Sequence, residues 1–293
     1  MPSSAPMTTL AAQALTWYDS HARDLPWRAA EATPWGILVS EVMLQQTPVV
    51  RVLPAWTAWL ERWPSPADLA ADTPAEAIRM WNRLGYPRRA LRLHACAVAI
   101  TEECDGVVPS DVDRLLALPG IGAYTARAVA AFAFGQRVPV VDVNVRRFLA
   151  RAVSGAADGG AATTPADFAL CESLLPEVDA PLVSAAYMEI GALVCTARAP
   201  KCVDCPVIET CAWRAAGQPA ATGPARKPQG YAGTDRQVRG LMMALLREAV
   251  DPVPLAALDA VWPDAVQRGR ALAGLVEDGL ARELPGRLYE LPG

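Results

Sequence analysis

The sequence predicts an all-α protein with a small winged-helix-like unit near its C-terminal end. Apolar residues recur at three- and four-residue spacing through most of the 293 residues, whereas strand-like alternation is rare. That period is typical of helices with one buried face. Prolines and Asp, Ser or Thr residues separate the periodic segments, as at Ser65-Pro66 and Thr73-Pro74. A composition of 52% hydrophobic and 20% charged residues is that of a globular chain.

The apolar period places the helices in order along the chain. Before residue 217 we expect helices over Leu10–Tyr18, Gly36–Leu44, Val49–Trp63, Pro74–Leu84, Arg88–Thr101, Val112–Leu118, Ala123–Phe134, Val143–Val153, Pro165–Leu175 and Leu182–Val194. The Pro-, Gly- and Ala-rich stretch Gly217–Gly233 indicates a linker. The winged-helix-like unit follows, with expected helices over Arg236–Ala249, Pro254–Val261 and Ala265–Glu277 and a hairpin within Ala281–Leu291.

Composition and charge narrow the classes of function. Residues Met1–Thr9 lack the basic start and apolar run of a secretory signal, and no apolar stretch is long enough to span a bilayer. We therefore expect a cytoplasmic protein without membrane contact. The net charge of −4 argues against a nucleic-acid partner. However, residues 79–92 carry five arginines and no acid, and residues 127–151 carry five arginines and only Asp142 as an acid. Charge alone leaves open whether these stretches bind DNA or are solvated helix faces.

Four of the seven cysteines form a compact motif. Cys195, Cys202, Cys205 and Cys211 follow a C-x6-C-x2-C-x5-C spacing, and the two-residue gap lets Cys202 and Cys205 present both thiolates to one metal centre. Spacing alone does not separate zinc from an iron–sulfur cluster, because both accept four thiolates. The remaining cysteines, Cys96, Cys104 and Cys171, lie in apolar helical settings and are expected to be core residues.

The segment Leu118-Pro119-Gly120-Ile121-Gly122 lies directly before an expected helix. Its two glycines permit a tight turn that exposes the amide groups at the start of that helix, where an anion such as a DNA phosphate is favoured. The same residues would also serve in an ordinary helix–helix turn. With apolar helices on both sides, the segment resembles a helix-hairpin-helix, a DNA-binding motif that does not read sequence.

Two carboxylates stand in contexts suited to catalysis. Glu41, in the run Ser-Glu-Val-Met-Leu-Gln-Gln-Thr, lies in an apolar helix, where burial would raise its pKa and keep it protonated. The alternative is an exposed glutamate on an amphipathic helix. Asp142 stands at the apparent start of a helix, whose dipole would favour the ionised form. An ionised Asp142 could stabilise positive charge on a sugar ring, or it could simply cap the helix.

The order of these motifs resembles that of the helix-hairpin-helix DNA glycosylase superfamily, and most closely its A/G-mismatch adenine glycosylases. The likeness runs from Leu25-Pro26-Trp27-Arg28 to Cys211, and the glutamate run and Gly-Ala-Leu-Val-Cys are its most specific parts. The resemblance implies a glycosylase fold with an iron–sulfur cluster helical domain at residues 1–24 and 136–216. It also implies a six-helix barrel with the helix-hairpin-helix at 25–135. Composition and periodicity, rather than the resemblance, place a linker at 217–234 and the small unit at 235–293.

The resemblance also implies roles for individual residues. Glu41 would protonate adenine N7 and later activate water, Asp142 would stabilise the oxocarbenium ion, and Tyr124 and Asn144 would hold these groups in place. Tyr86 matches the residue that wedges into the base stack, and Gln46 lies in the loop that parts the strands. The full set of residues expected to bind substrate or DNA is Arg28, Gln46, Tyr86, Gly120, Gly122 and Lys201. The four cysteines of the motif would hold a [4Fe-4S] cluster that has a structural role.

The implied function is base excision repair by a monomer acting on duplex DNA that contains adenine opposite 8-oxoguanine or guanine. Bifunctional relatives carry a lysine where this chain has Tyr124, and the only two lysines, Lys201 and Lys227, lie elsewhere. We therefore expect base removal by water without strand cleavage. One alternative is a thymine or uracil mismatch glycosylase of the same superfamily. Another, of a different class, is a non-catalytic iron–sulfur scaffold that binds DNA.

Three features depart from the family pattern. Pro87 replaces the usual second tyrosine after Gly-Tyr, and Ala185 replaces an amide or acid that many members use at the adenine. Residues after Asp235 are too few for the pyrophosphohydrolase-like domain that inspects 8-oxoguanine in many members. The preference for 8-oxoguanine over guanine is therefore open, and we expect the C-terminal unit to contribute to the contact with the opposite strand.

Overall fold

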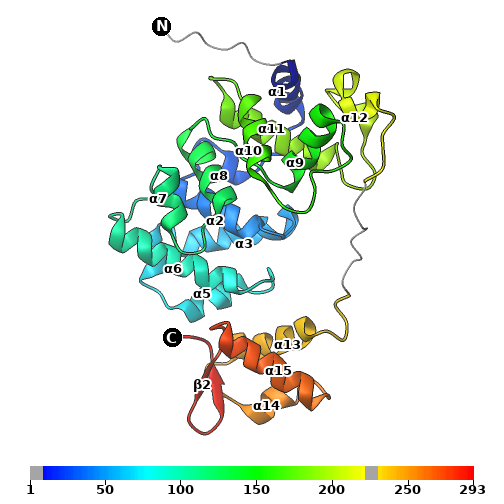
Figure 1. Cartoon of the computed structure of the whole chain (residues 1–293). Coiled ribbons are helices and arrows are strands. Elements are labelled where there is room, and N and C mark those ends of the chain that lie inside the picture. The colour runs from blue at the N-terminus through cyan, green and yellow to red at the C-terminus, as the bar shows by residue number, and fades with distance from the viewer. Residues whose placement is uncertain (1–8, 222–229) are drawn as a thin grey trace. The chain divides into compact units, whose positions relative to one another are not determined.

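The computed structural model describes residues 9–221 and 230–293 (Figure 1). Chain contacts divide the molecule into two compact units. The described residues of the first unit are 9–37, 110–116 and 122–221, and those of the second are 38–109, 117–121 and 230–293. The division into three domains and a linker expected from the sequence stays a prediction. No helix in the described ranges is long and apolar enough to cross a membrane.

The first unit is helical throughout its described part. Its helices are α1 (Thr9–His21), α7 (Val112–Ala117, whose last residue belongs to the second unit), α8 (Ala123–Phe134), α9 (Val143–Leu149), α10 (Pro165–Ser173), α11 (Ala180–Leu193) and α12 (Ala212–Ala215), and its single turns are Pro26–Arg28, Cys202–Asp204 and Ile208–Thr210. Helices α1, α9 and α11 surround a core in which the rings of Phe148 and Tyr187 stand 5.5 Å apart.

A glycine allows α9 and α11 to pack closely. A Cβ atom at Gly191 would lie 2.6 Å from the backbone oxygen of Asn144, a distance at which the backbone must move. The Gly-Ala-Leu-Val-Cys motif therefore begins with the residue that lets α11 approach the start of α9. This packing brings the beginning of the cysteine motif close to the residues after Asp142.

The second unit contains helices α3 (Val49–Arg62), α4 (Pro66–Ala70), α5 (Pro74–Trp81) and α6 (Arg88–Glu103), and α2 (Pro34–Leu44) spans the division between the units. Three tryptophans form the centre of its core. The ring of Trp59 meets those of Trp63 and Trp81 edge-on, at centroid distances of 4.7 and 5.6 Å. Edge-on contact is a favoured arrangement of aromatic rings and adds to their area of burial.

The C-terminal part of the second unit, residues 235–293, has the expected winged-helix-like arrangement and is called the C-terminal unit. It consists of α13 (Asp235–Glu248), α14 (Leu255–Asp259), α15 (Ala265–Glu277), β1 (Val253–Pro254), β2 (Arg282–Leu284) and β3 (Leu288–Glu290). The strands form an antiparallel sheet in the order β1-β3-β2, in which Val253 is paired with Tyr289. The hairpin prediction is confirmed. The sequence did not indicate β1, because two residues are too few to show alternation.

Most helix bounds agree with the periodicity, and the differences have local causes. Helix α5 ends at Trp81 rather than Leu84, because Asn82 takes a left-handed conformation with φ 47°. After Leu149 the chain continues as a π-helical turn over Ala150–Ser154, and all but the last of these residues lie within the segment predicted as one helix. The five-residue helix α4 was missed, although Ser65 caps it through a capping box. Residues 222–229 of the expected linker lie outside the described residues.

Candidate active site

Glu41 lies on a helix that is buried on all sides. Every residue from Trp35 to Met43 is buried, and Glu41 itself is 5% exposed. The alternative of an exposed glutamate on an amphipathic helix is therefore wrong. A carboxyl group taken out of water favours its neutral form, which is the form that can donate a proton.

Asp142 is the N-cap of α9. Its Oδ1 accepts a hydrogen bond from the Val145 amide at 2.7 Å, and its Oδ2 accepts one from the Asn144 side chain at 2.7 Å. Burial raises the pKa of Asp142, while these hydrogen bonds and the charge of Arg147 oppose that rise. The expectation that the helix dipole alone would keep Asp142 ionised thus omitted the larger effect, which is desolvation by the surrounding fold.

A chain of hydrogen bonds leads from Asp142 to the cysteine motif. Asn144, which donates to Asp142, accepts through Oδ1 from Arg147 at 2.9 Å. The buried guanidinium of Arg147 also donates to the backbone oxygens of Cys195 at 2.7 Å and Gly191 at 2.5 Å. The first cysteine of the motif and the carboxylate at the start of α9 are therefore held in one polar network.

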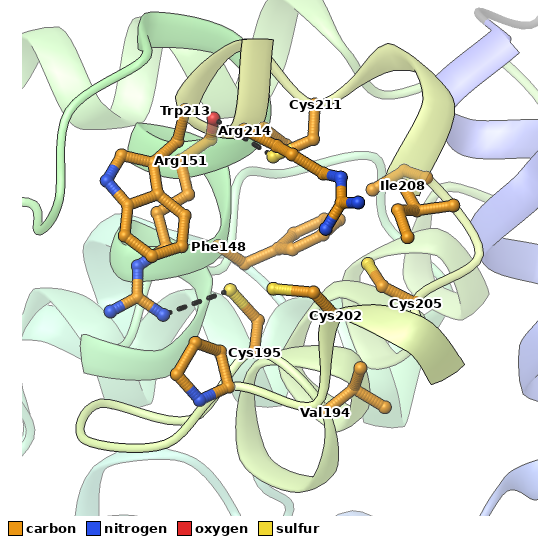
Figure 2. Close-up of a pocket in the computed structure, with 13 residues that line it drawn as sticks. Phe148, Arg151, Val194, Cys195, Cys202, Cys205, Ile208, Cys211, Trp213 and Arg214 are labelled. Atoms are coloured by element: carbon orange, nitrogen blue, oxygen red, sulfur yellow. Dashed lines mark hydrogen bonds between the residues drawn. The ribbon is translucent and has the colours of Figure 1, made fainter. Parts of the chain in front are cut away.

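The four cysteines of the motif line one pocket, and in Figure 2 Cys211 lies at the top, Cys205 at the right, and Cys195 and Cys202 next to each other below. Arg151 donates to the sulfur of Cys195 at 3.5 Å, and burial raises the pKa of Cys205 to about 11. Apolar side chains, among them Phe148, complete the lining. The pocket thus offers four sulfur ligands, apolar walls and an N–H donor to sulfur. This set of groups fits an iron–sulfur cluster.

The other cysteines lie outside this pocket. Cys96 and Cys171 are fully buried, and burial raises the pKa of each to about 12, as expected of core residues. Cys104, in contrast, is only partly buried, at the C-terminal end of α6. Among the described residues, no three His, Cys, Asp or Glu side chains stand close enough together to hold a single metal ion.

Gln46 and Tyr86 lie in two loops with strained backbones. Both residues are exposed, and their φ angles of 57° and 49° lie in the left-handed region that favours glycine. Arg89, on α6, donates hydrogen bonds to both loops. Sequence reasoning missed Arg89, although a signal was present, because helical spacing places it on the same buried face of α6 as Leu93 and Ile100.

The two glycines before α8, Gly120 and Gly122, lie in different structural environments. Gly120 has φ 77°, and a Cβ atom there would lie 2.6 Å from Cβ of Arg92. Gly122 is the N-cap of α8, in an extended conformation without a side-chain cap. The predicted tight turn is present, and its role in binding phosphate stays a prediction.

The remaining predicted residues lie in the first unit. Tyr124, on α8, packs against a small cluster around Val140. Arg28 donates to the fully buried Glu189 at 2.9 Å, and Lys201 is exposed beside Cys202. Glu41 belongs to the second unit and Asp142 to the first.

Comparison with known proteins identifies the family. Residues 39–170 match the family described as "HhH-GPD superfamily base excision DNA repair protein". The "Adenine DNA glycosylase" of Mycolicibacterium smegmatis is 57% identical over 280 residues, which cover 95% of this chain and 94% of that protein. The protein of the same name from Mycobacterium tuberculosis is 54% identical over 282 residues, covering 95% and 92%. The chain belongs to the adenine DNA glycosylase family. The resemblance inferred from the motifs and the assignment to an enzyme class are thereby confirmed.

Solved structures confirm the helix-hairpin-helix glycosylase fold. A structure titled as a thermostable thymine-DNA glycosylase is 27% identical, with a TM-score of 0.64 over 70% of this chain and 95% of that one. A non-covalent endonuclease III–DNA complex, 22% identical with a TM-score of 0.60, matches in fold over 71% of this chain and 94% of that one. The match to the M. smegmatis adenine DNA glycosylase leaves out only 5% of this chain, so it extends into the C-terminal unit.

Proposed function

We propose that this chain hydrolyses the N-glycosidic bond of adenine mispaired with 8-oxoguanine or guanine in duplex DNA. The observation that carries the proposal is Glu41, a carboxyl group 5% exposed on a helix made mostly of apolar residues. Membership of a family whose relatives are adenine DNA glycosylases supports it. The product is an abasic site, and the protein works as a monomer in base excision repair.

Glu41 acts first as an acid and then as a base. As the bond between the sugar and adenine N9 breaks, its electron pair moves into the base, and N7 takes the proton of Glu41. The Glu41 carboxylate then accepts a proton from the water that attacks the sugar carbon. Protonation makes the purine a better leaving group, and such proton transfers contribute about 10²- to 10⁴-fold to a rate.

Asp142 stabilises the positive charge that develops on the sugar during this bond cleavage. It must be ionised to do so, and its hydrogen bonds from Val145 and Asn144 favour the ionised form against the effect of burial. Tyr124 stands where a bifunctional enzyme has its lysine, so no amine attacks the sugar, and water completes the reaction.

The cysteine pocket holds a [4Fe-4S] cluster. When bound, this group would supply a rigid cross-link among the four cysteines and would take no redox part in the reaction. Arg151 donates a hydrogen bond to Cys195, and Arg147 ties the backbone of Cys195 to Asn144. Loss of the cluster should therefore disturb the surroundings of Asp142. A brown colour and a broad visible absorbance distinguish the cluster from zinc.

The C-terminal unit contributes to contact with the strand opposite adenine. Asp278 accepts from Arg88 on α6 at 3.0 Å and from Arg239 on α13. This ion pair joins the unit to the helix that follows Tyr86. In addition, the Arg236 guanidinium lies 5.9 Å from the centre of the Tyr86 ring. The unit thus places a positive charge beside the residue that matches the stack wedge.

Excision from defined mispairs tests the proposal. We expect release of adenine opposite 8-oxoguanine and guanine, with strand breaks appearing only after alkali. Glu41→Gln should lower the rate about 10²- to 10⁴-fold without loss of DNA binding, whereas Glu102→Gln, at an exposed position on α6, should leave it unchanged. Preferred release of thymine opposite guanine would favour the mismatch glycosylase instead. Binding without any base release would favour the scaffold, and nicking without alkali would refute a monofunctional reaction.

A further inference from the structure

Arg89 occupies an unusual position on α6. Its side chain is buried, with 6% of the residue exposed, and its guanidinium makes five hydrogen bonds of 2.7–3.0 Å. The acceptors are the backbone oxygens of Val42, Met43, Gln45 and Gly85 and the hydroxyl of Thr47. These acceptors lie at the C-terminal end of α2 and in the two loops that contain Gln46 and Tyr86. One planar group thus connects the helix of Glu41 with both loops.

No carboxylate accompanies this buried charge. Among the described residues, Arg89 forms no ion pair, and its buried Nε has no hydrogen-bond partner. Burial lowers the pKa of Arg89 to about 10. A cation without a counterion is costly to bury, and here only neutral oxygen acceptors offset that cost. The charge of Arg89 is thus held by the end of α2 and by the two loops.

The two loops need support from outside themselves. Left-handed backbone at non-glycine residues, such as Gln46 and Tyr86, costs about 1–3 kcal/mol and persists only where the surrounding structure holds it. Arg89 bonds to the carbonyl before Gln46, to the hydroxyl after it, and to the carbonyl before Tyr86. Its guanidinium also lies 5.7 Å from the centre of the Tyr86 ring. It therefore fixes the two loops relative to each other.

We propose that Arg89 is a positioning residue for base extrusion, which holds Gln46 and Tyr86 in the geometry that opens the base stack. This inference rests on the proposed function. The flat fork of arginine reaches several acceptors in one plane, and the single ammonium of lysine does not. Opening the stack costs a few kcal/mol, so a loop displaced from its productive geometry would slow this step more than the bond cleavage that follows.

The test separates stack opening from chemistry. In a Glu41→Gln background, 2-aminopurine beside the mispaired adenine reports unstacking on binding without any cleavage. Adding Arg89→Lys should remove at least half of the fluorescence rise at saturating protein. In the protein that retains Glu41, Arg89→Lys should slow single-turnover excision from the mispair by about 10- to 30-fold. This corresponds to an increase of about 1.4–2 kcal/mol in the activation free energy. On an adenine in an unpaired bubble, where the stack is already open, the loss should shrink to about threefold or less, since opening no longer limits the rate.

Arg137→Lys is the matched control, because the Arg137 guanidinium also donates to three backbone oxygens, those of Glu172, Leu175 and Pro176, in the first unit. It should change neither signal. Equal losses on both substrates, or an unchanged fluorescence rise, would overturn the proposal. If circular dichroism shows that Arg89→Lys does not fold, Thr47→Val carries the test by removing one acceptor. A loss confined to the stacked mispair supports the proposal, and wild-type behaviour overturns it. The fluorescence measurement does not depend on which base is cleaved, so its failure is distinct from failure of the proposed function.

Discussion

Two sites in this protein at which arginine bonds to buried acceptors are built in opposite ways. In the first unit, the fully buried carboxylate of Glu189 accepts from the backbone and side chain of Arg23 and from Arg28. In the second unit, Arg89 is held by carbonyl oxygens and a hydroxyl without any carboxylate among the described residues. The first site pairs its arginines with a buried carboxylate, and the second leaves a positive charge without a carboxylate beside loops expected to meet DNA.

The two sites therefore differ in their roles. The Glu189 site links distant segments of the chain, whereas the Arg89 site fixes the conformation of two loops. The Glu189 site joins residues 166 positions apart and ties the segment after α1 to α11. Its two arginines keep the pKa of Glu189 at about 2 despite burial. Its strength should therefore depend on pH, while the Arg89 site should not change in acid, because neither arginine nor a carbonyl group titrates there. The following predictions test this contrast.

The largest expected effect is that of Glu189→Gln on stability. The amide keeps the shape of the side chain but leaves two arginines facing a neutral group. Breaking a buried pair typically costs about 3–5 kcal/mol, and we expect the lower end because Arg23 and Arg28 can turn toward solvent. Denaturant unfolding at pH 7 measures this cost. Glu177→Gln, at an exposed pair with Arg137, is the control and should change stability by less than about 1 kcal/mol. Equal small changes would show that the buried site is no anchor.

The second prediction concerns acid. The pKa of Glu189 falls from 4.5 in the unfolded chain to about 2 in the folded one, so the ionised form stabilises the fold. That stabilisation is complete above about pH 4.5 and is lost as the pH falls toward 2. It amounts to about 3 kcal/mol at 1.36 kcal/mol for each pKa unit. The difference in unfolding free energy between the wild type and Glu189→Gln should thus shrink from pH 5 to pH 2. The difference in unfolding free energy between the wild type and Arg89→Lys should stay constant over this range. If the differences for both variants changed with pH in the same way, the contrast between the two sites would be contradicted.

Sequence patterns predicted the features that depend on neighbouring residues. The apolar run around Glu41 indicated its burial, and the position of Asp142 before an apolar segment indicated an N-cap. Local reasoning did not find the raised pKa of Asp142, since desolvation comes from the packed fold. Glu189 also lies in an apolar helical segment, as Glu41 does. The signal that marked Glu41 therefore does not distinguish a proton donor from a carboxylate that anchors the fold.

Features built from distant segments were beyond the reach of pattern analysis. The acceptors of Arg89 near Glu41 lie 42 to 47 residues away in the sequence, and nothing in the run around Gln46 indicates that an arginine will cap it. The likeness of motifs to a family supplied residues that are expected to touch substrate. It did not supply Arg89, which holds two of them in place, because the role of Arg89 depends on contacts between loops that are distant in the sequence.

The smallest expected effect comes from a third arginine site, at Asp278, which is intermediate between the other two. Like Glu189 it accepts from two arginines, Arg88 and Arg239, but its side chain is 22% exposed. Solvent screens such a pair, so Asp278→Asn should lower the free energy of unfolding by only about 1 kcal/mol.

Because the ion pair joins the C-terminal unit to α6, the variant should weaken binding to a mispaired duplex more than binding to a fully paired one. Fluorescence anisotropy with both duplexes measures this selectivity. Glu290→Gln, which loses an exposed pair with Arg282 inside the C-terminal unit, should leave the selectivity intact. If Asp278→Asn leaves it intact as well, the C-terminal unit does not take part in recognising the mispair, and the positive charge near Tyr86 has to act through Arg89 alone.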